Sequence, residues 1–150
     1  MLSIHKQIVR AIFLIAIFAC CQPGTFAHAQ ADAKTVGTQK SESGIRHSFL
    51  VTGSITAIIG EDNRVKWQVP GSSRDGFVLP NGNVLVSIAN SAREYTRDGK
   101  LVFEYKLDPV NKELGTVVRL ENGNTMVVER GAKPRILEIT PAGKIAVAVP

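Results

Sequence analysis

Arg74 and Asp75 are the neighbouring residues of this chain that are best suited to hold a ligand. A guanidinium group binds anionic oxygens through paired hydrogen bonds, and an adjacent carboxylate can orient it. The segment 72–75 (SSRD) also departs from its counterpart 113–116 (ELGT) in an internal repeat of the chain. We therefore predict Arg74 and Asp75 as ligand-binding residues, with an ordinary turn and a local ion pair as the alternative.

Cysteine and histidine do not add a second site. Cys20 and Cys21 are the only cysteines, and both lie in an N-terminal segment that export would remove. Without them the exported domain has neither disulfides nor a zinc–thiolate site. His47 is the only histidine beyond that segment, and one histidine cannot build a His-rich metal site. The sequence therefore predicts no catalytic residue, metal or cofactor, and favours a protein that is not an enzyme.

The N-terminal residues have the three parts of a secretory signal peptide. Lys6 and Arg10 give a basic start, residues 11–21 form an apolar run, and 27–29 (AHA) is a small-x-small cleavage site. The apolar run is shorter than the about 20 residues that span a bilayer. We predict a signal peptide over 1–29 and a secreted or periplasmic protein, with an uncleaved anchor as an alternative.

A second alternative is a lipid anchor at Cys20. Residues 17–20 (IFAC) loosely resemble the bacterial lipobox, in which the cysteine is lipidated and becomes the new N-terminus. Phe18 is bulkier than that motif usually accepts, and the site at 27–29 competes with it. Cleavage after Ala29 is the favoured prediction.

Residues 30–46 have the composition of a flexible linker. They are rich in Ala, Thr, Ser, Gln and Lys, with few apolar residues, so they cannot bury enough surface to fold. The formal net charge of the chain is +5, and its acidic and basic residues are interleaved. This pattern indicates a solvated surface and excludes a nucleic-acid patch.

The remaining chain contains an internal repeat. Residues 79–86 (LPNGNVLV) return as 120–127 (LENGNTMV), and residues 94–101 (EYTRDGKL) return as 138–145 (EITPAGKI). Asn-Gly and Asp-Gly between apolar runs mark tight hairpin turns. Two such signals in each unit of about 40 residues are typical of a β-propeller blade.

The fold class is therefore predicted as all-β, with β-propeller blades of four antiparallel strands in an incomplete ring. Residues 47–150 form this partial propeller, with blades at about 48–70, 74–108 and 115–150. The first blade lacks its innermost strand. In the alignment of the units two sets of apolar residues correspond, and we expect them to pack between neighbouring sheets: Val65, Leu101 and Ile145, and Trp67, Phe103 and Val147.

Fewer than three complete blades do not close a ring, since propellers typically have 4–8. Terminal blades with uncovered apolar faces favour association. The chain is thus expected either to assemble with copies of itself or with other propeller blades, or to be the N-terminal fragment of a longer product. The fragment is the favoured prediction.

Two segments resemble known propeller repeats. Residues 60–68 (GEDNRVKWQ) look like the Asp-x-Gly-x-x-x-Trp hallmark of pyrroloquinoline-quinone-like repeats, with Asn63 in place of the glycine. Residues 79–86 are similar to the Leu-Pro-(Asn/Asp)-Gly-Asn-x-Leu-(Val/Ile) element of secreted bacterial propellers, and NHL-like and lactonase-like repeats share this style. The resemblance covers about residues 48–150 and specifies a fold more than an activity.

The resemblance implies two enzymatic possibilities. Quinone-dependent dehydrogenases place adjacent cysteines against their cofactor, but the only such pair here is Cys20 and Cys21. Lactonase-like propellers bind a metal through residues from several blades, more than this chain contains. The sequence thus favours an exported, non-catalytic binding or scaffold module with an unknown small-molecule or protein ligand. The N-terminal part of a propeller enzyme, and a self-assembling structural protein, remain as alternatives.

Overall fold

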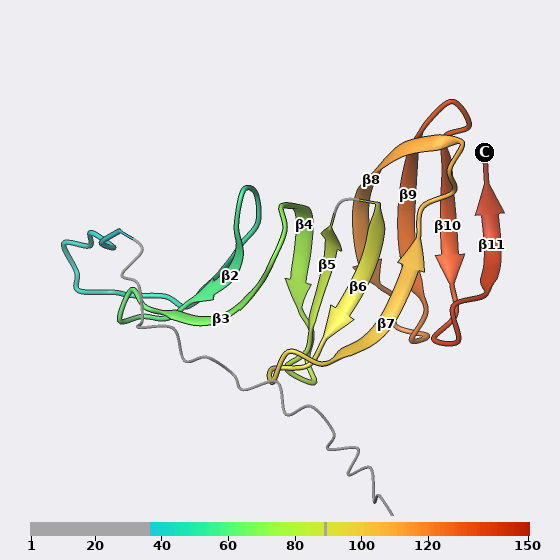
Figure 1. Cartoon of the computed structure of the whole chain (residues 1–150). Helices are drawn as coiled ribbons and strands as arrows, with labels where there is room; N and C mark the ends of the chain where they lie inside the picture. Colours follow the sequence, from blue (N-terminus) through green and yellow to red (C-terminus); the bar gives the residue numbers. More distant parts are fainter. Residues whose placement is uncertain (1–36, 89) are drawn as a thin grey trace, which may run out of the picture.

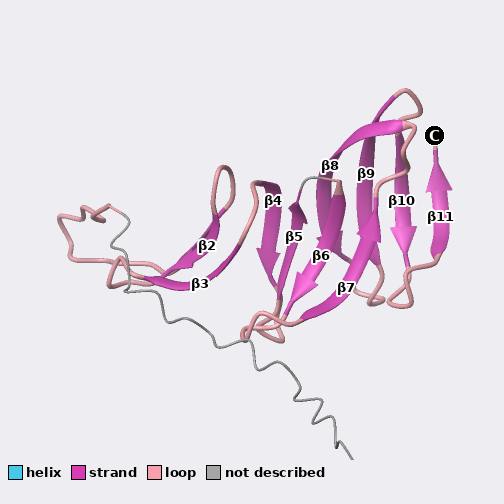
Figure 2. Cartoon of the chain, viewed as in Figure 1, coloured by secondary structure: helices cyan, strands magenta, loops and turns pink. Residues whose placement is uncertain are grey.

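The computed structural model describes residues 37–88 and 90–150, and these residues form β-strands and no helix. Eleven strands make three separate antiparallel sheets that follow one another along the chain (Figures 1 and 2). The all-β prediction is confirmed at this level. No closed sheet is formed by the described residues, so the propeller is taken up again only as a proposal. The predicted signal peptide at 1–29 and both cysteines lie outside the described residues.

The first sheet has three strands, and the second and third have four. In each sheet, strands that are consecutive in the chain are hydrogen-bonded neighbours. The first sheet contains β1 (Phe49–Val51), β2 (Thr56–Ile59) and β3 (Val65–Val69). The second contains β4 (Ser73–Val78), β5 (Val84–Ile88), β6 (Ser91–Tyr95) and β7 (Leu101–Lys106). The third contains β8 (Asn111–Arg119), β9 (Thr125–Gly131), β10 (Arg135–Ile139) and β11 (Ile145–Val149).

The Asn-Gly turns form where the sequence places them. Gly82 and Gly123 have φ angles of 84° and 83°, which glycine adopts without a steric penalty. Their asparagine neighbours do not share this conformation. Instead the Asn81 side chain accepts a 3.0 Å hydrogen bond from the amide two residues on, and Asn122 does the same. These residues therefore close the turn through a side-chain acceptor and a glycine, rather than through two positive φ angles.

The second sheet is covered on both faces at β5. Every residue of β5 is buried, whereas an exposed sheet face would leave alternate residues in solvent. Val84, Val86 and Ile88 pack with Ile58 and Trp67 of the first sheet. On the opposite face the core includes residues from the second and third sheets. These are Leu85, Ala92, Phe103, Val117, Val127 and Leu137.

The third sheet is covered on one face only. Burial alternates along β9, and all of β11 is exposed. The prediction that Val147 packs between sheets is therefore wrong, because no described sheet covers that face. Leu101 and Ile145 are also exposed, by 44% and 50%, while Trp67 and Phe103 are buried as expected.

Residues at equivalent repeat positions pair with each other in the same way in all three sheets. Leu50 pairs with Ile58, which pairs with Trp67, across the first sheet. The equivalent rows are Leu85, Glu94 and Phe103 in the second sheet, and Met126, Glu138 and Val147 in the third. Among the described residues, the first sheet has no counterpart of β4 and β8, in line with the predicted absence of an innermost strand. β4 begins at Ser73 and β8 at Asn111, before the predicted blade starts at about 74 and 115, so residues 73–75 belong to a strand rather than to a turn.

Candidate functional site

Arg74 and Asp75 lie on β4 and face β8. An Arg74 Nη atom donates a 2.6 Å hydrogen bond to the Glu113 carboxylate, and this ion pair is substantially exposed. The Asp75 carboxylate accepts hydrogen bonds from the Thr116 hydroxyl and, at 3.3 Å, from the Val117 amide. The predicted ligand residues therefore join the second sheet to the third. Their binding of an anion remains a prediction.

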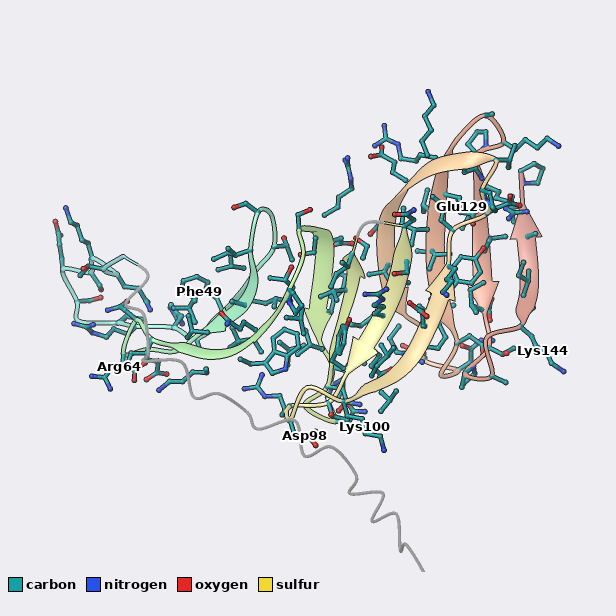
Figure 3. All side chains as sticks on the ribbon, in the orientation of Figure 1. Phe49, Arg64, Asp98, Lys100, Glu129 and Lys144 are labelled. Carbon is teal, nitrogen blue, oxygen red and sulfur yellow. The ribbon has the colours of Figure 1, made fainter. Side chains whose placement is uncertain are left out.

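Glu129 is the centre of a buried polar cluster, which we call the Glu129 cluster (Figure 3). Its carboxylate accepts hydrogen bonds from the Tyr105 hydroxyl at 2.6 Å and the Asp108 amide at 3.0 Å. It also accepts from the Asn111 amide group at 2.8 Å and the Arg135 Nε at 2.7 Å. The donors come from β7, the β7–β8 connection, β8 and β10. One carboxylate therefore ties the outer strand of the second sheet to three parts of the chain around the third.

The hydrogen bonds keep Glu129 ionised despite its burial. Burial by itself raises the pKa of this carboxyl, but the bonds from Arg135, Tyr105, the Asp108 amide and Asn111 outweigh it and lower the pKa to about 2. Burial and the adjacent carboxylate raise the pKa of Tyr105 to about 12. At neutral pH a neutral phenol thus donates to a charged carboxylate. Because donors occupy both oxygens, the cluster is suited to clamping strands rather than to moving protons.

A second carboxylate, Glu94, lies between the second and third sheets. It accepts a 2.6 Å hydrogen bond from the Asn83 side chain and pairs with Arg119 of β8. The Arg119 guanidinium also lies over the Phe103 ring, 5.5 Å from its centroid. Both members of the ion pair are largely buried. This pair therefore fixes how β8 packs against the neighbouring sheet.

Glu138 repeats the Glu94 site on the third sheet. The side chains of Asn124 and Asn122 donate to it at 2.6 Å and 2.8 Å, and these bonds lower its pKa. No arginine of residues 37–88 and 90–150 pairs with it in the manner of Arg119. The surrounding apolar side chains are about half exposed, at 46% for Ile136 and 48% for Val147. We call this surface, formed by Met126, Val128, Ile136, Glu138, Val147 and Val149, the open face.

An open groove of about 470 Å³ lies between the first and second sheets. Phe49 and Leu50 of β1 and Ile58 of β2 form one side, and Val78 of β4 and the Arg97 side chain are among the residues opposite. Phe49 and Val78 are 43% and 49% exposed. The walls of the groove are mainly apolar.

The other residues considered from the sequence, Trp67 and His47, contact neighbouring residues of the fold. Trp67 is buried, donates through Nε1 to the Thr96 carbonyl at 3.2 Å and meets the Tyr95 ring edge-on at 6.2 Å. Its prediction as a core residue is confirmed. The amide of His47 donates to the side chain of Gln39 at 2.9 Å. Within the described part of the chain, no cluster of three or more His, Cys, Asp or Glu residues could hold a metal, and no helix is long and apolar enough to cross a membrane.

The Glu129 cluster and the Glu94–Arg119 pair were not identified from the sequence. Both join residues that are far apart in the chain, with a sequence separation of 24 for Tyr105 and Glu129 and of 25 for Glu94 and Arg119. One signal was available for Glu94, because glutamate recurs at Glu138 in the aligned repeat. For Glu129 the aligned residue is Ile88, so the repeat gave no indication of a buried acid.

Comparison with known proteins defines a structural similarity and no family. No family model matches the chain, and no curated protein matches it. A solved structure described as a protein of unknown function from Bacteroides caccae is similar, with a TM-score of 0.59 and 26% sequence identity. The match covers 69% of this chain and 40% of that protein. The chain therefore spans less than half the length of this structural neighbour.

Proposed function

We propose that this protein is an exported, non-catalytic binding or scaffold module, built from propeller-type blades that associate through their sheet faces. One observation carries the proposal: the open face of the third sheet repeats the surface that the second sheet uses to bind the third. The packed surface has Leu85, Ala92, Glu94, Phe103 and Tyr105, and the open face has Met126, Ile136, Glu138, Val147 and Val149 at the same positions.

The charged residues of the described sheets support the proposal that these surfaces bind other sheets. Glu94 and Arg119, and Arg74 and Glu113, join one sheet to the next. On the open face Glu138 occupies the position of Glu94. Two open faces packed directly on each other would bring like charges together and leave them desolvated, which is unfavourable. Association is therefore head-to-tail, between the open face and another surface of a second copy.

The alternative function is the N-terminal part of a larger propeller enzyme, of the quinone-dependent dehydrogenase or lactonase-like kind. It is favoured by the length of the structural neighbour, of which this chain matches 40%. In that case the open face would contact a further blade of the same polypeptide, and the catalytic residues would lie in that additional part.

Light scattering after size exclusion, performed on the purified exported protein over a range of concentrations, tests the proposal. We expect species larger than a monomer, and we expect Val147→Lys to shift them to the monomer, because it places a charge in the open face. Val102→Lys is the matched control, since Val102 is 47% exposed and lies on β7, outside the open face. A wild-type protein that stays monomeric throughout would overturn self-association and favour the larger-enzyme alternative.

A further inference from the structure

The two Asn-Gly turns are the places in this chain best suited to a spontaneous chemical change. Asn81-Gly82 and Asn122-Gly123 are the only Asn-Gly pairs in the sequence, and both asparagines are exposed. Asparagine is among the thermolabile residues. A following glycine has no side chain, so its backbone nitrogen can approach the asparagine side chain closely. Each pair therefore has the residue types that deamidation requires, which is the conversion of the side-chain amide to a carboxylate.

Deamidation at Asn81 needs water as its only co-reactant. The backbone nitrogen of Gly82, after losing its proton to hydroxide, attacks the side-chain carbon Cγ of Asn81. A new bond between this nitrogen and Cγ closes a cyclic imide. The bond between Cγ and Nδ2 breaks, and Nδ2 leaves with the electron pair, takes a proton from water and becomes ammonia. Water then opens the imide at either carbonyl, which gives aspartate or isoaspartate.

The two turns present the same backbone to this reaction. The Gly82 amide donates to the Leu79 carbonyl at 2.8 Å, and the Gly123 amide donates to the Leu120 carbonyl at 3.0 Å. The φ angles of the two glycines are 84° and 83°. In both turns the amide must leave its carbonyl before it can attack, through a local opening of the turn. The backbone therefore gives no reason for the two sites to react at different rates.

The asparagine side chains, in contrast, are restrained differently. Each Oδ1 atom accepts a 3.0 Å hydrogen bond from the amide two residues on. Nδ2 of Asn122 also donates to the Glu138 carboxylate at 2.8 Å. Glu94, the residue equivalent to Glu138, is bonded to other side chains and receives no such bond from Asn81 within the described residues. Turning Cγ toward the glycine nitrogen thus breaks two side-chain bonds at Asn122 and one at Asn81.

We propose that Asn81 is a deamidation site of the folded protein and that Glu138 protects the equivalent Asn122. The product at position 81 places a negative charge beside the groove between the first and second sheets, which Gly82 and Arg97 line. The same change at position 122 would place a second carboxylate against Glu138, where like charges repel. The argument uses hydrogen bonds within each sheet, so the proposal does not depend on the proposed function.

Peptide mapping by mass spectrometry on the full chain tests the proposal. The purified protein is incubated at neutral pH, and conversion at positions 81 and 122 is followed with time. One exposed hydrogen bond is a modest restraint, so we expect Asn81 to react about fivefold faster than Asn122. In urea the restraint is lost, and the two rates should converge. No reaction at Asn81, equal rates in the folded protein, or a rate ratio that urea leaves unchanged would overturn the proposal.

Substitutions at Glu138 identify the protecting group. Glu138→Ala removes the acceptor and should raise the rate at Asn122 about fivefold, whereas Glu138→Gln keeps a side-chain carbonyl that accepts from Nδ2 and should raise it much less. The rate at Asn81 is the internal control and should not change. Val147→Lys alters the open face but keeps Glu138, and should leave both rates unchanged. Faster reaction at Asn122 in Val147→Lys, with none in Glu138→Ala, would assign the protection to association at the open face and reject the role of Glu138.

Discussion

The two interfaces between neighbouring sheets use the same strand geometry with opposite chemistry. Between the first and second sheets the core is apolar, with Ile58 and Trp67 against Val84 and Val86, and the hydrogen bonds are between neutral groups, such as Trp67 Nε1 and the Thr96 carbonyl. Between the second and third sheets an apolar centre is flanked by ion pairs and by the Glu129 cluster. One repeat position illustrates the contrast, since Ile58 of the first sheet is replaced by Glu94 of the second.

This difference shows that repeated sheets can keep the same strand arrangement while the stability of their interfaces responds differently to pH and to substitution. Apolar burial does not depend on pH and contributes roughly 25 cal/mol per Å² of buried apolar area. A buried carboxylate stabilises the fold only while its donors remain in place, and loss of one partner leaves an uncompensated charge or donor. We therefore expect substitutions and acid to affect the second–third interface selectively.

The largest expected effect is that of Glu129→Ala. The substitution removes the buried acceptor of the Tyr105 hydroxyl, the Asn111 amide group and Arg135 Nε. Asn111 keeps its hydrogen bond to the Lys133 carbonyl and Arg135 its pair with Asp108, but each loses its bond to the buried carboxylate. We expect the free energy of unfolding to fall by about 3–5 kcal/mol. Urea denaturation would show it as a lower midpoint with an unchanged slope.

Glu113→Ala is the matched control for that measurement. Glu113 also carries two ion pairs, with Arg74 and Arg130, but all three side chains are substantially exposed. Exposed pairs contribute about 0–1 kcal/mol, so this variant should lose less than about 1 kcal/mol. If the two variants were equally destabilised, burial of the cluster would not be the source of its contribution.

Acid should weaken the second–third interface before the first–second interface. The pKa of Glu129 is lowered in the folded state, from 4.5 to about 2. Its contribution is therefore complete above pH 4.5 and is lost as the pH falls toward 2, up to ~3 kcal/mol. The single tryptophan, Trp67, lies in the first–second interface and reports on it alone. Exchange protection of β9 and β10 should fall at a higher pH than that at which the Trp67 emission changes.

The Glu129→Ala variant is the control for the acid experiment, because it lacks the group that titrates. Its stability should depend less on pH between 4.5 and 2 than that of the wild type. Loss of Trp67 burial at the same pH as loss of β9 protection would show that the two interfaces respond as one unit, and would remove the contrast between them.

Much of the strand pattern could be predicted from local sequence. Apolar runs and Asn-Gly or Asp-Gly turns predicted the three blades at about 48–70, 74–108 and 115–150, and the strands of the three sheets begin and end within a few residues of these bounds. Both features depend on neighbours in the chain. The starts of β4 and β8 were missed because Arg74, Asp75 and Glu113 look like turn residues, yet they pair across sheets.

The functional surfaces were harder to predict because they depend on which sheet faces are covered. Val147 has the same pattern in sequence as Phe103, but only Phe103 has a neighbouring sheet against it. The Glu129 cluster collects donors from four separate parts of the chain, and no spacing rule brings these together. The sequence could therefore predict the repeat, while the structure was needed to distinguish a packed face from an open one.

The smallest expected effect is that of Arg74→Ala at the edge of the second–third interface. The Arg74 side chain is 52% exposed, so loss of its pair with Glu113 should cost less than about 1 kcal/mol in urea denaturation. The predicted anion site gives a separate expectation, which is that the wild type binds inorganic phosphate and the variant does not. Isothermal titration calorimetry distinguishes the two roles. A variant that binds phosphate as well as the wild type but is slightly less stable would assign Arg74 to the interface alone. The reason is that its guanidinium already forms a 2.6 Å hydrogen bond to the Glu113 carboxylate of the third sheet, which neutralises the charge that an anionic ligand would need.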